Sequence, residues 1–201
     1  MLPVSAVAGP REKTLFDAIK AGDTAGVSAL IKKRANVNAR DGHGATPLIH
    51  ASADGMISAV RELLKAGANP NFSDRDGSTA LMAAAFNGYT VIAAMLIKSG
   101  ANVNARAKTG ETALVYSAVT GHEGAVRLLL ERKANPNIRN NEGETALMGA
   151  AAAGQAGVVK ELIRHGANVN LKDKSGKTAL AYAKAKKHQN IAETLSRAGV
   201  K

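Results

Sequence analysis

One spacing dominates this chain: a threonine returns every 33 residues, and a leucine follows each threonine two positions later. The threonines are Thr46, Thr79, Thr112, Thr145 and Thr178. A glycine stands two residues before each of them, and an Asn-x-Asn tripeptide closes each period. A fixed period of this length predicts a stack of similar supersecondary units in place of a single globular core.

Residues 73–105 show how one unit is expected to fold. Thr79 follows a turn sequence and offers its hydroxyl as the N-cap of a helix predicted over 80–86. Gly88 ends that helix, and a second helix is predicted over 90–99. Neither helix is long enough to persist alone in water, so each unit must bury its Leu and Ala side chains against its neighbours.

At particular residues the sequence resembles the ankyrin repeat family. The resemblance is carried by Thr46-Pro47-Leu48, by Leu63-Leu64 and by Gly67-Ala68-Asn69-Pro70-Asn71. The Gly-Glu-Thr-Ala-Leu sequences at 110–114 and 143–147 are similar to variants frequent in bacterial members. The resemblance implies an all-α ankyrin-repeat solenoid, with helix-turn-helix repeats and β-hairpin or turn tips.

One departure from the family pattern recurs. The family usually has His directly after Thr-Pro-Leu, whereas this chain has other residues there: Ile49, Met82, Val115, Met148 and Ala181. His50 comes one residue too late to take that place. The hydrogen bond between Thr and His at the hairpin base is therefore not expected here.

The period also divides the chain into parts. We expect an N-terminal tail over 1–10 and a single ankyrin-repeat domain over 11–201. Within it, we expect an N-terminal cap (11–39), full repeats (40–72, 73–105, 106–138 and 139–171) and a C-terminal capping repeat (172–201). The N-terminal cap is predicted to hold helices over 15–21 and 27–33. The protein is expected to be a monomer.

Several classes of protein do not fit the composition. The chain has no Cys, and no apolar stretch approaches the ~20 residues that cross a bilayer. The 5 His include no pair at metal-ligand spacing, and no phosphate-cradling loop of the Gly-x-x-x-x-Gly-Lys type is present. We therefore expect no enzyme activity, no metal site and no cofactor.

The formal net charge of +11 sits mainly at the two ends, with +3 in 11–39 and +6 in 172–201. A basic strip recurs in phase at the hairpin bases: Arg40, Arg106, Arg139 and Lys172. Its members either pair with nearby acids such as Asp41 and Asp173, remain solvated, or steer an acidic partner. Nucleic acid is the less expected partner, because the basic track is not continuous.

The resemblance implies that a protein partner binds to the hairpin tips and to the groove-facing side of the first helices. Helical spacing selects the groove residues, which share one face: His50, Asp54, Phe86, Asn87, Tyr116, Val119 and Thr120. Phe86, Tyr116 and Val119 are the bulky apolar members, and they serve either as anchors for a partner or as packing between helices.

The hairpin rim is the second part of the expected binding surface. Its residues differ between repeats, so packing does not dictate them: His43, Arg75, Asp76, Lys108, Thr109, Asn141, Glu142 and Lys174. The alternative function is electrostatic binding of nucleic acid or an anionic surface. It would use the basic strip and the C-terminal lysines Lys184, Lys186, Lys187 and Lys201.

The first ten residues leave the compartment open. They lack a basic leader and are too short for a signal peptide, but Ala6-Val7-Ala8 resembles a small-residue cleavage site. Both the cytoplasm and the bacterial periplasm remain compatible with this segment.

Overall fold

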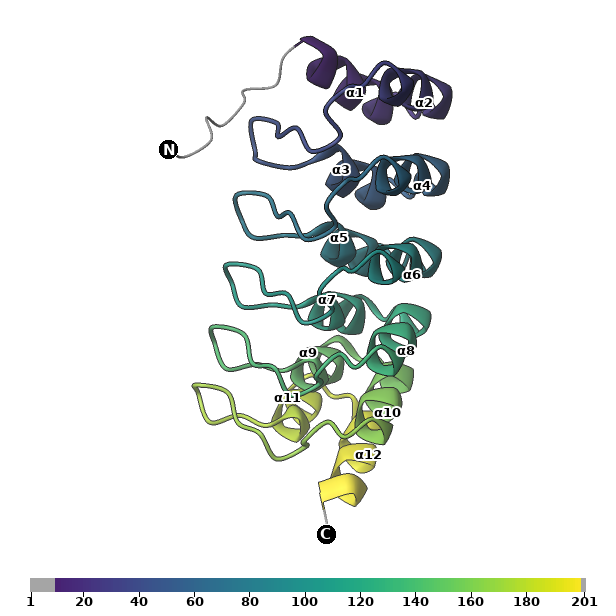
Figure 1. Ribbon diagram of the computed structural model, residues 1–201. Helices are drawn as coiled ribbons and strands as arrows, with labels where there is room; N and C mark the ends of the chain where they lie inside the picture. Colours follow the sequence, from purple (N-terminus) through teal and green to yellow (C-terminus); the bar gives the residue numbers. More distant parts are fainter. Residues whose placement is uncertain (1–9, 200–201) are drawn as a thin grey trace. The chain divides into compact units, whose positions relative to one another are not determined.

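The computed structural model describes residues 10–199, and twelve helices without a strand follow one another in that range (Figure 1). The predicted all-α repeat fold is confirmed.

The structure divides into two compact units. The first unit extends to Ala84 and includes Val91–Asn102, and the second comprises Ala85–Thr90 and the residues from Val103 onward. The single domain over 11–201 stays a prediction, and Ala6-Val7-Ala8 and Lys201 lie outside the described residues.

The first unit contains four complete helices and most of two more. They are α1 (Pro10–Lys20), α2 (Thr24–Lys32), α3 (Pro47–Ala53), α4 (Ile57–Lys65), α5 (Ala80–Phe86) and α6 (Thr90–Lys98). α1 packs on α2 and α3, and α4 packs on α2 and α3. Both helices of the N-terminal cap begin earlier than predicted. For α2 the reason is that the Asp23 side chain accepts a hydrogen bond from the Gly26 N–H at 2.8 Å and so caps the helix.

The second unit repeats the same arrangement in pairs. Its helices are α7 (Ala113–Thr120), α8 (Glu123–Glu131), α9 (Ala146–Ala153), α10 (Ala156–Arg164), α11 (Ala179–Ala185) and α12 (Gln189–Gly199). α7, α9 and α11 pack in series, as do α8, α10 and α12. Within residues 10–199, no helix has the length and apolar character needed to cross a membrane.

The periodic threonines and leucines perform the roles predicted for them. Each threonine hydroxyl accepts a hydrogen bond from the N–H three residues later, at 3.3–3.4 Å. The leucines of the four full repeats are only 1% exposed: Leu48, Leu81, Leu114 and Leu147. The last member, Leu180, is only half-buried, because within residues 10–199 no later repeat packs on α11.

A ladder of asparagines joins consecutive repeats within each unit. The Asn137 Nδ2 donates to the Gly166 carbonyl at 3.2 Å, and its Oδ1 accepts from the Asn168 N–H at 2.7 Å. The same pair of bonds is made by Asn38, Asn71 and Asn104. The Asn-x-Asn tripeptides therefore satisfy loop backbone groups of the next repeat as well as turning the chain.

Ser52→Ala is expected to raise the free energy of unfolding by about 1 kcal/mol. The Ser52 hydroxyl is fully buried in α3 and has no hydrogen-bond partner. The following repeats place Ala85, Ala118 and Ala151 at this position. Urea unfolding measures the change.

Ser117→Ala is the matched control for Ser52→Ala. The Ser117 hydroxyl is equally buried, but it donates to the Leu114 carbonyl at 3.2 Å. We expect this variant to be neutral or slightly destabilised. A loss of stability in Ser52→Ala as large as that in Ser117→Ala would contradict the argument.

Candidate functional site

The hairpins between repeats present the rim residues on a shared backbone framework. Neighbouring tips are joined by main-chain hydrogen bonds of 2.9 Å, from Arg75 N–H to the His43 carbonyl, from Asn141 to Thr109 and from Lys174 to Glu142. The side chains of all eight rim residues are exposed. The backbone therefore joins the tips and leaves most of their side chains free to vary, except that the Asn141 Nδ2 donates to the Lys108 carbonyl at 2.7 Å.

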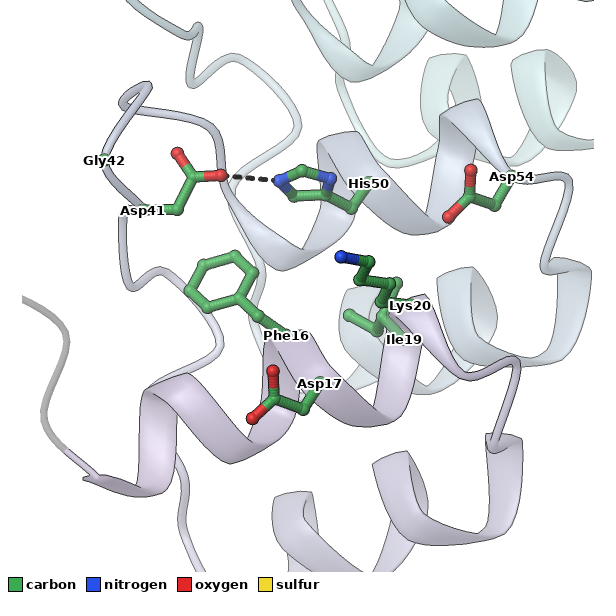
Figure 2. Close-up of a pocket in the computed structure, with 8 residues that line it drawn as sticks. All are labelled: Phe16, Asp17, Ile19, Lys20, Asp41, Gly42, His50 and Asp54. Carbon is green, nitrogen blue, oxygen red and sulfur yellow. Dashed lines mark hydrogen bonds and ion pairs between the residues drawn. The ribbon is translucent and has the colours of Figure 1, made fainter.

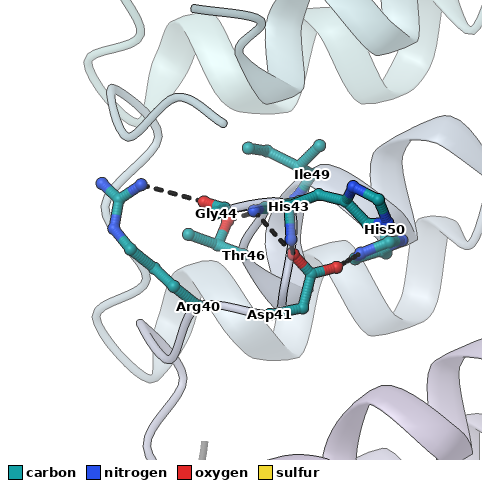
Figure 3. A network of polar contacts seen from close by, with 8 residues as sticks. Arg40, Asp41, His43, Gly44, Thr46, Ile49 and His50 are labelled. Carbon is teal, nitrogen blue, oxygen red and sulfur yellow. Dashed lines mark hydrogen bonds and ion pairs between the residues drawn. The ribbon is translucent and has the colours of Figure 1, made fainter. Parts of the chain in front are cut away.

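The arginines of the basic strip bind backbone carbonyls. Arg139 donates to the Gly143 carbonyl at 3.1 Å and to the Lys172 carbonyl at 2.6 Å. Arg106 and Arg40 do the same one and three repeats earlier, and Figure 3 shows the bond from Arg40 to Gly44. The expected pairing with Asp41 and Asp173 is wrong, because the guanidiniums connect consecutive hairpins and these acids bind other groups.

Asp41 binds a histidine on the following helix. The His50 Nε2 lies 2.7 Å from the Asp41 Oδ2 (Figures 2 and 3). Partial burial opposes ionisation of Asp41, but the hydrogen bonds from His50, His43 N–H and Ala45 N–H together lower its pKa. His50, one of the groove residues, is therefore held at the hairpin base, where the family's usual histidine is missing.

A tyrosine takes the same position in the last repeat. The Tyr182 hydroxyl donates to the Asp173 Oδ2 at 2.6 Å and contacts the Glu144 Oε1 at 2.9 Å. This bond, with those from the Lys177 and Ser175 N–H groups, lowers the pKa of Asp173 from 3.8 to about 2. The same bond to Asp173, together with burial and Glu144, raises the pKa of Tyr182.

Tyr182→Phe is expected to raise the pKa of Asp173 from about 2 toward 3.8. The folded-state pKa lies below the unfolded value, so the stabilisation is complete above about pH 3.8 and is lost as the pH falls through about 2. In the variant the folded and unfolded pKa values nearly coincide, so most of this stabilisation and its loss in acid are absent. NMR titration of the carboxyl measures the pKa, and acid unfolding followed by circular dichroism measures the consequence.

Tyr116→Phe serves as the control for this experiment. Tyr116 occupies the same repeat position, but its hairpin carries Ala107 where Asp173 stands in the last repeat. The pKa of Asp173 should stay near 2 in this variant, because the Tyr182 hydroxyl that binds Asp173 is retained. An Asp173 pKa that stayed near 2 in Tyr182→Phe would show that the backbone N–H groups suffice without the hydroxyl.

The bulky groove residues form an apolar patch in the second unit. The Phe86 and Tyr116 rings meet edge to face, with centroids 6.2 Å apart and an interplanar angle of 80°. Phe86 is nevertheless 51% exposed and Val119 is 43% exposed. A Cβ added to Gly149 would lie 2.7 Å from the Val119 Cγ2, so Val119 rests on α9 at a position that only glycine fits. The patch thus combines packing between helices with exposed apolar surface.

The remaining groove residues are polar. Asp54 and Asn87 are exposed at the ends of α3 and α5. Thr120 is half-buried, and its hydroxyl donates to the Tyr116 carbonyl at 2.8 Å. Asn87 and Thr120 therefore belong to the same unit as the apolar patch, whereas Asp54 belongs to the first unit.

The first unit holds a cavity of about 590 Å³ between α1, α3 and the first hairpin (Figure 2). Phe16 stands edge-on to the His50 ring at 5.6 Å, and Asp17, Lys20 and Asp54 surround the opening. Nowhere between residues 10 and 199 do three His, Asp or Glu side chains come together as a metal ion would require.

The repeated architecture has a counterpart in a known protein family. The family model described as "Ankyrin repeats (3 copies)" matches residues 7–74, 49–140 and 132–201. The chain belongs to the ankyrin repeat family. Ankyrin repeats are generally protein–protein interaction modules, and proteins built from them are typically non-enzymatic binding scaffolds. A search of curated proteins found no match.

Sequence reasoning missed two features of these ankyrin repeats. The bonds from His50 to Asp41 and from Tyr182 to Asp173 join residues nine positions apart. The common signal is an acid in the hairpin followed by a ring with a donor on the next helix. The arginine bonds to carbonyls leave no signal of this kind, because their acceptors are backbone atoms.

Proposed function

We propose that this ankyrin repeat protein is a non-enzymatic scaffold that binds a protein partner through its groove residues and hairpin rim. One observation carries the proposal: Phe86, on the groove-facing side, keeps 51% of its surface exposed while its ring rests against Tyr116. A rigid aromatic side chain that is already supported by a neighbour loses little entropy on binding, and residues of this kind dominate binding energies.

The rim supports the same proposal by its freedom to vary. Its eight side chains are exposed, and main-chain hydrogen bonds join neighbouring tips. The Asn141 side chain also donates to the Lys108 carbonyl at 2.7 Å. Substitution at the other rim positions therefore alters contacts with a partner with little effect on the repeat. An aromatic centre surrounded by variable polar residues is the usual anatomy of a protein interface.

The alternative is electrostatic binding of nucleic acid or an anionic surface. The last repeat favours it, because its lysines are exposed. The arginines of the basic strip favour it less, since each already donates two hydrogen bonds to carbonyls of its own and the next hairpin. Their orientation is set by the fold and not by a ligand.

Affinity capture from host lysate at low and moderate salt tests the proposal, with the Phe86→Ala/Tyr116→Ala double variant beside the wild type. Val91→Ala is the matched control, because Val91 is 57% exposed on α6 and lies outside the groove residues. Circular dichroism checks that each variant is folded. We expect a protein retained at both salts by the wild type and by Val91→Ala, and lost by the double variant.

Two results would overturn the proposal. The first is a partner retained equally by the folded double variant, which would remove the role of the aromatic pair. The second is capture of nucleic acid or of many acidic proteins by every variant, with release at moderate salt. That pattern would make charge the basis of binding.

A further inference from the structure

The second unit places an apolar anchor and a group of free cations on the same series of helices. Phe86, Tyr116 and Val119 lie on α5 and α7, whereas Lys186 and Lys187 follow the end of α11. α7, α9 and α11 pack in that order within the unit. A bound segment that follows this series passes from the anchor to the lysines.

The floor between the anchor and the lysines is made of small residues. The positions on α9 that correspond to Tyr116, Val119 and Thr120 are Gly149, Ala152 and Ala153. Val119 fills the space over Gly149. Ala152 and Ala153 are small and at least partly exposed, so the backbone of a bound segment can approach the end of α9 closely, between a bulky apolar end and a charged end.

The charge of the last repeat is strongly one-sided. Within residues 172–199, its exposed cations on and after α11 are Lys184, Lys186, Lys187 and Arg197, and those in the preceding hairpin are Lys172, Lys174 and Lys177. Glu193 on α12 is the exposed acid in this range, since Asp173 is buried and accepts hydrogen bonds from Tyr182 and Ser175. The cations are thus left without internal neutralisation, which complements an acidic ligand.

The hairpin side of the same unit restricts where acids can bind. Glu111 and Glu144 lie at the hairpin bases next to α7 and α9, and Glu144 contacts Tyr182. These two acids oppose the binding of ligand carboxylates next to α7 and α9. The lysines after α11 are therefore the expected contacts for the carboxylates of a ligand.

The spacing between the two ends follows from helix packing. Neighbouring helices pack about 8–10 Å apart, so the three steps from Phe86 on α5 to α11 span roughly 24–30 Å. An extended peptide rises about 3.3 Å per residue. Phe86 and the lysines are thus about seven to nine residues apart for an extended ligand.

We propose that the second unit recognises an acidic segment of a partner protein that carries a large apolar side chain about seven to nine residues from its carboxylates. The inference rests on the proposed function and adds the chemistry of the partner. A nucleic acid fits less well, because the unit's exposed anchor is apolar and its arginines Arg106 and Arg139 are bound to carbonyls.

Selection from a random peptide display library on the full chain tests this inference. The enriched peptides are then synthesised and their Kd is measured with three variants: Phe86→Ala, Lys186→Ser/Lys187→Ser and the control Lys65→Ser/Lys98→Ser. Lys65 and Lys98 are exposed at the ends of α4 and α6, in the first unit. A single-stranded oligothymidine is measured as a competing ligand.

We expect enriched peptides with an apolar residue and acids at the stated spacing. Phe86→Ala should weaken them about tenfold or more, and the Lys186/Lys187 variant about three- to tenfold at low salt, with the control within about twofold. Peptides that depend on Phe86 but lack acids, or that ignore the lysines, would overturn this inference and leave the proposed function intact.

Binding that does not depend on Phe86 would overturn the proposed function together with this inference. Failure to enrich any peptide above background would overturn the inference. Tighter binding of the oligothymidine than of any peptide, with a steep salt dependence, would do the same in favour of nucleic acid.

Discussion

Leu147→Ala is expected to lower the free energy of unfolding by about 3 kcal/mol. Leu147 is 1% exposed on α9, which packs against α7 on one side and α11 on the other. Truncation leaves a cavity between three helices, and none of them can close it without losing contact with another. Because repeats are stabilised by their neighbours, the loss acts on both interfaces of α9.

Leu180→Ala is the matched control, since Leu180 occupies the same repeat position on α11. It is half-buried, beside a cavity of about 300 Å³ at the end of the unit. We expect this variant to lose about 1 kcal/mol or less, because part of the side chain already meets solvent. Urea unfolding of both variants measures the difference, and equal losses would contradict the argument.

Gly143→Ala is expected to cost about 2–3 kcal/mol, from two sources that add. Gly143 has φ +82°, a conformation that an L-residue adopts only with strain. Its added Cβ would also lie 2.7 Å from the Arg139 Nη2 and 3.0 Å from the Lys174 N. The Arg139 guanidinium cannot move away freely, because it is held by the Gly143 and Lys172 carbonyls.

Gly176→Ala separates the two sources of this cost. Gly176 has φ +78°, but a Cβ there would meet no atom of residues 10–199 within 4 Å. We expect this variant to lose about 1 kcal/mol, which is the conformational part alone. Thermal unfolding of both variants measures the difference, and a Gly143→Ala variant as stable as Gly176→Ala would show that the arginine yields easily.

Much of the fold is predictable from the sequence because its signals are local and periodic. The hydroxyl of Thr79 and the helix over 80–86 depend on residues within a few positions of one another, and both are confirmed. The N-terminal cap was harder to delimit. α2 begins at Thr24 because Asp23 caps it, and that aspartate has no counterpart in the periodic pattern.

The candidate site was only partly predictable. Helical spacing correctly placed Phe86 and Val119 on an exposed side, but it could not decide whether Phe86 and Tyr116 bind or pack. In the structure the two rings contact each other while Phe86 stays half exposed. Phe86 therefore packs against Tyr116 and still exposes apolar surface to a partner. The hydrogen bonds from the arginines of the basic strip to backbone carbonyls were missed. The sequence does not distinguish an arginine that binds a carbonyl from one that is free.

The asparagine ladder has a consequence for changes in chain length. Each ladder asparagine finds its acceptor 29 residues ahead and its donor 31 residues ahead, in the next repeat. An insertion of a few residues between two ladder positions would take both bonds out of register. Insertion or deletion of a whole 33-residue repeat would leave each remaining asparagine facing an equivalent loop. The ladder thus favours growth and shrinkage of the chain by complete repeats, as gene duplication and deletion provide.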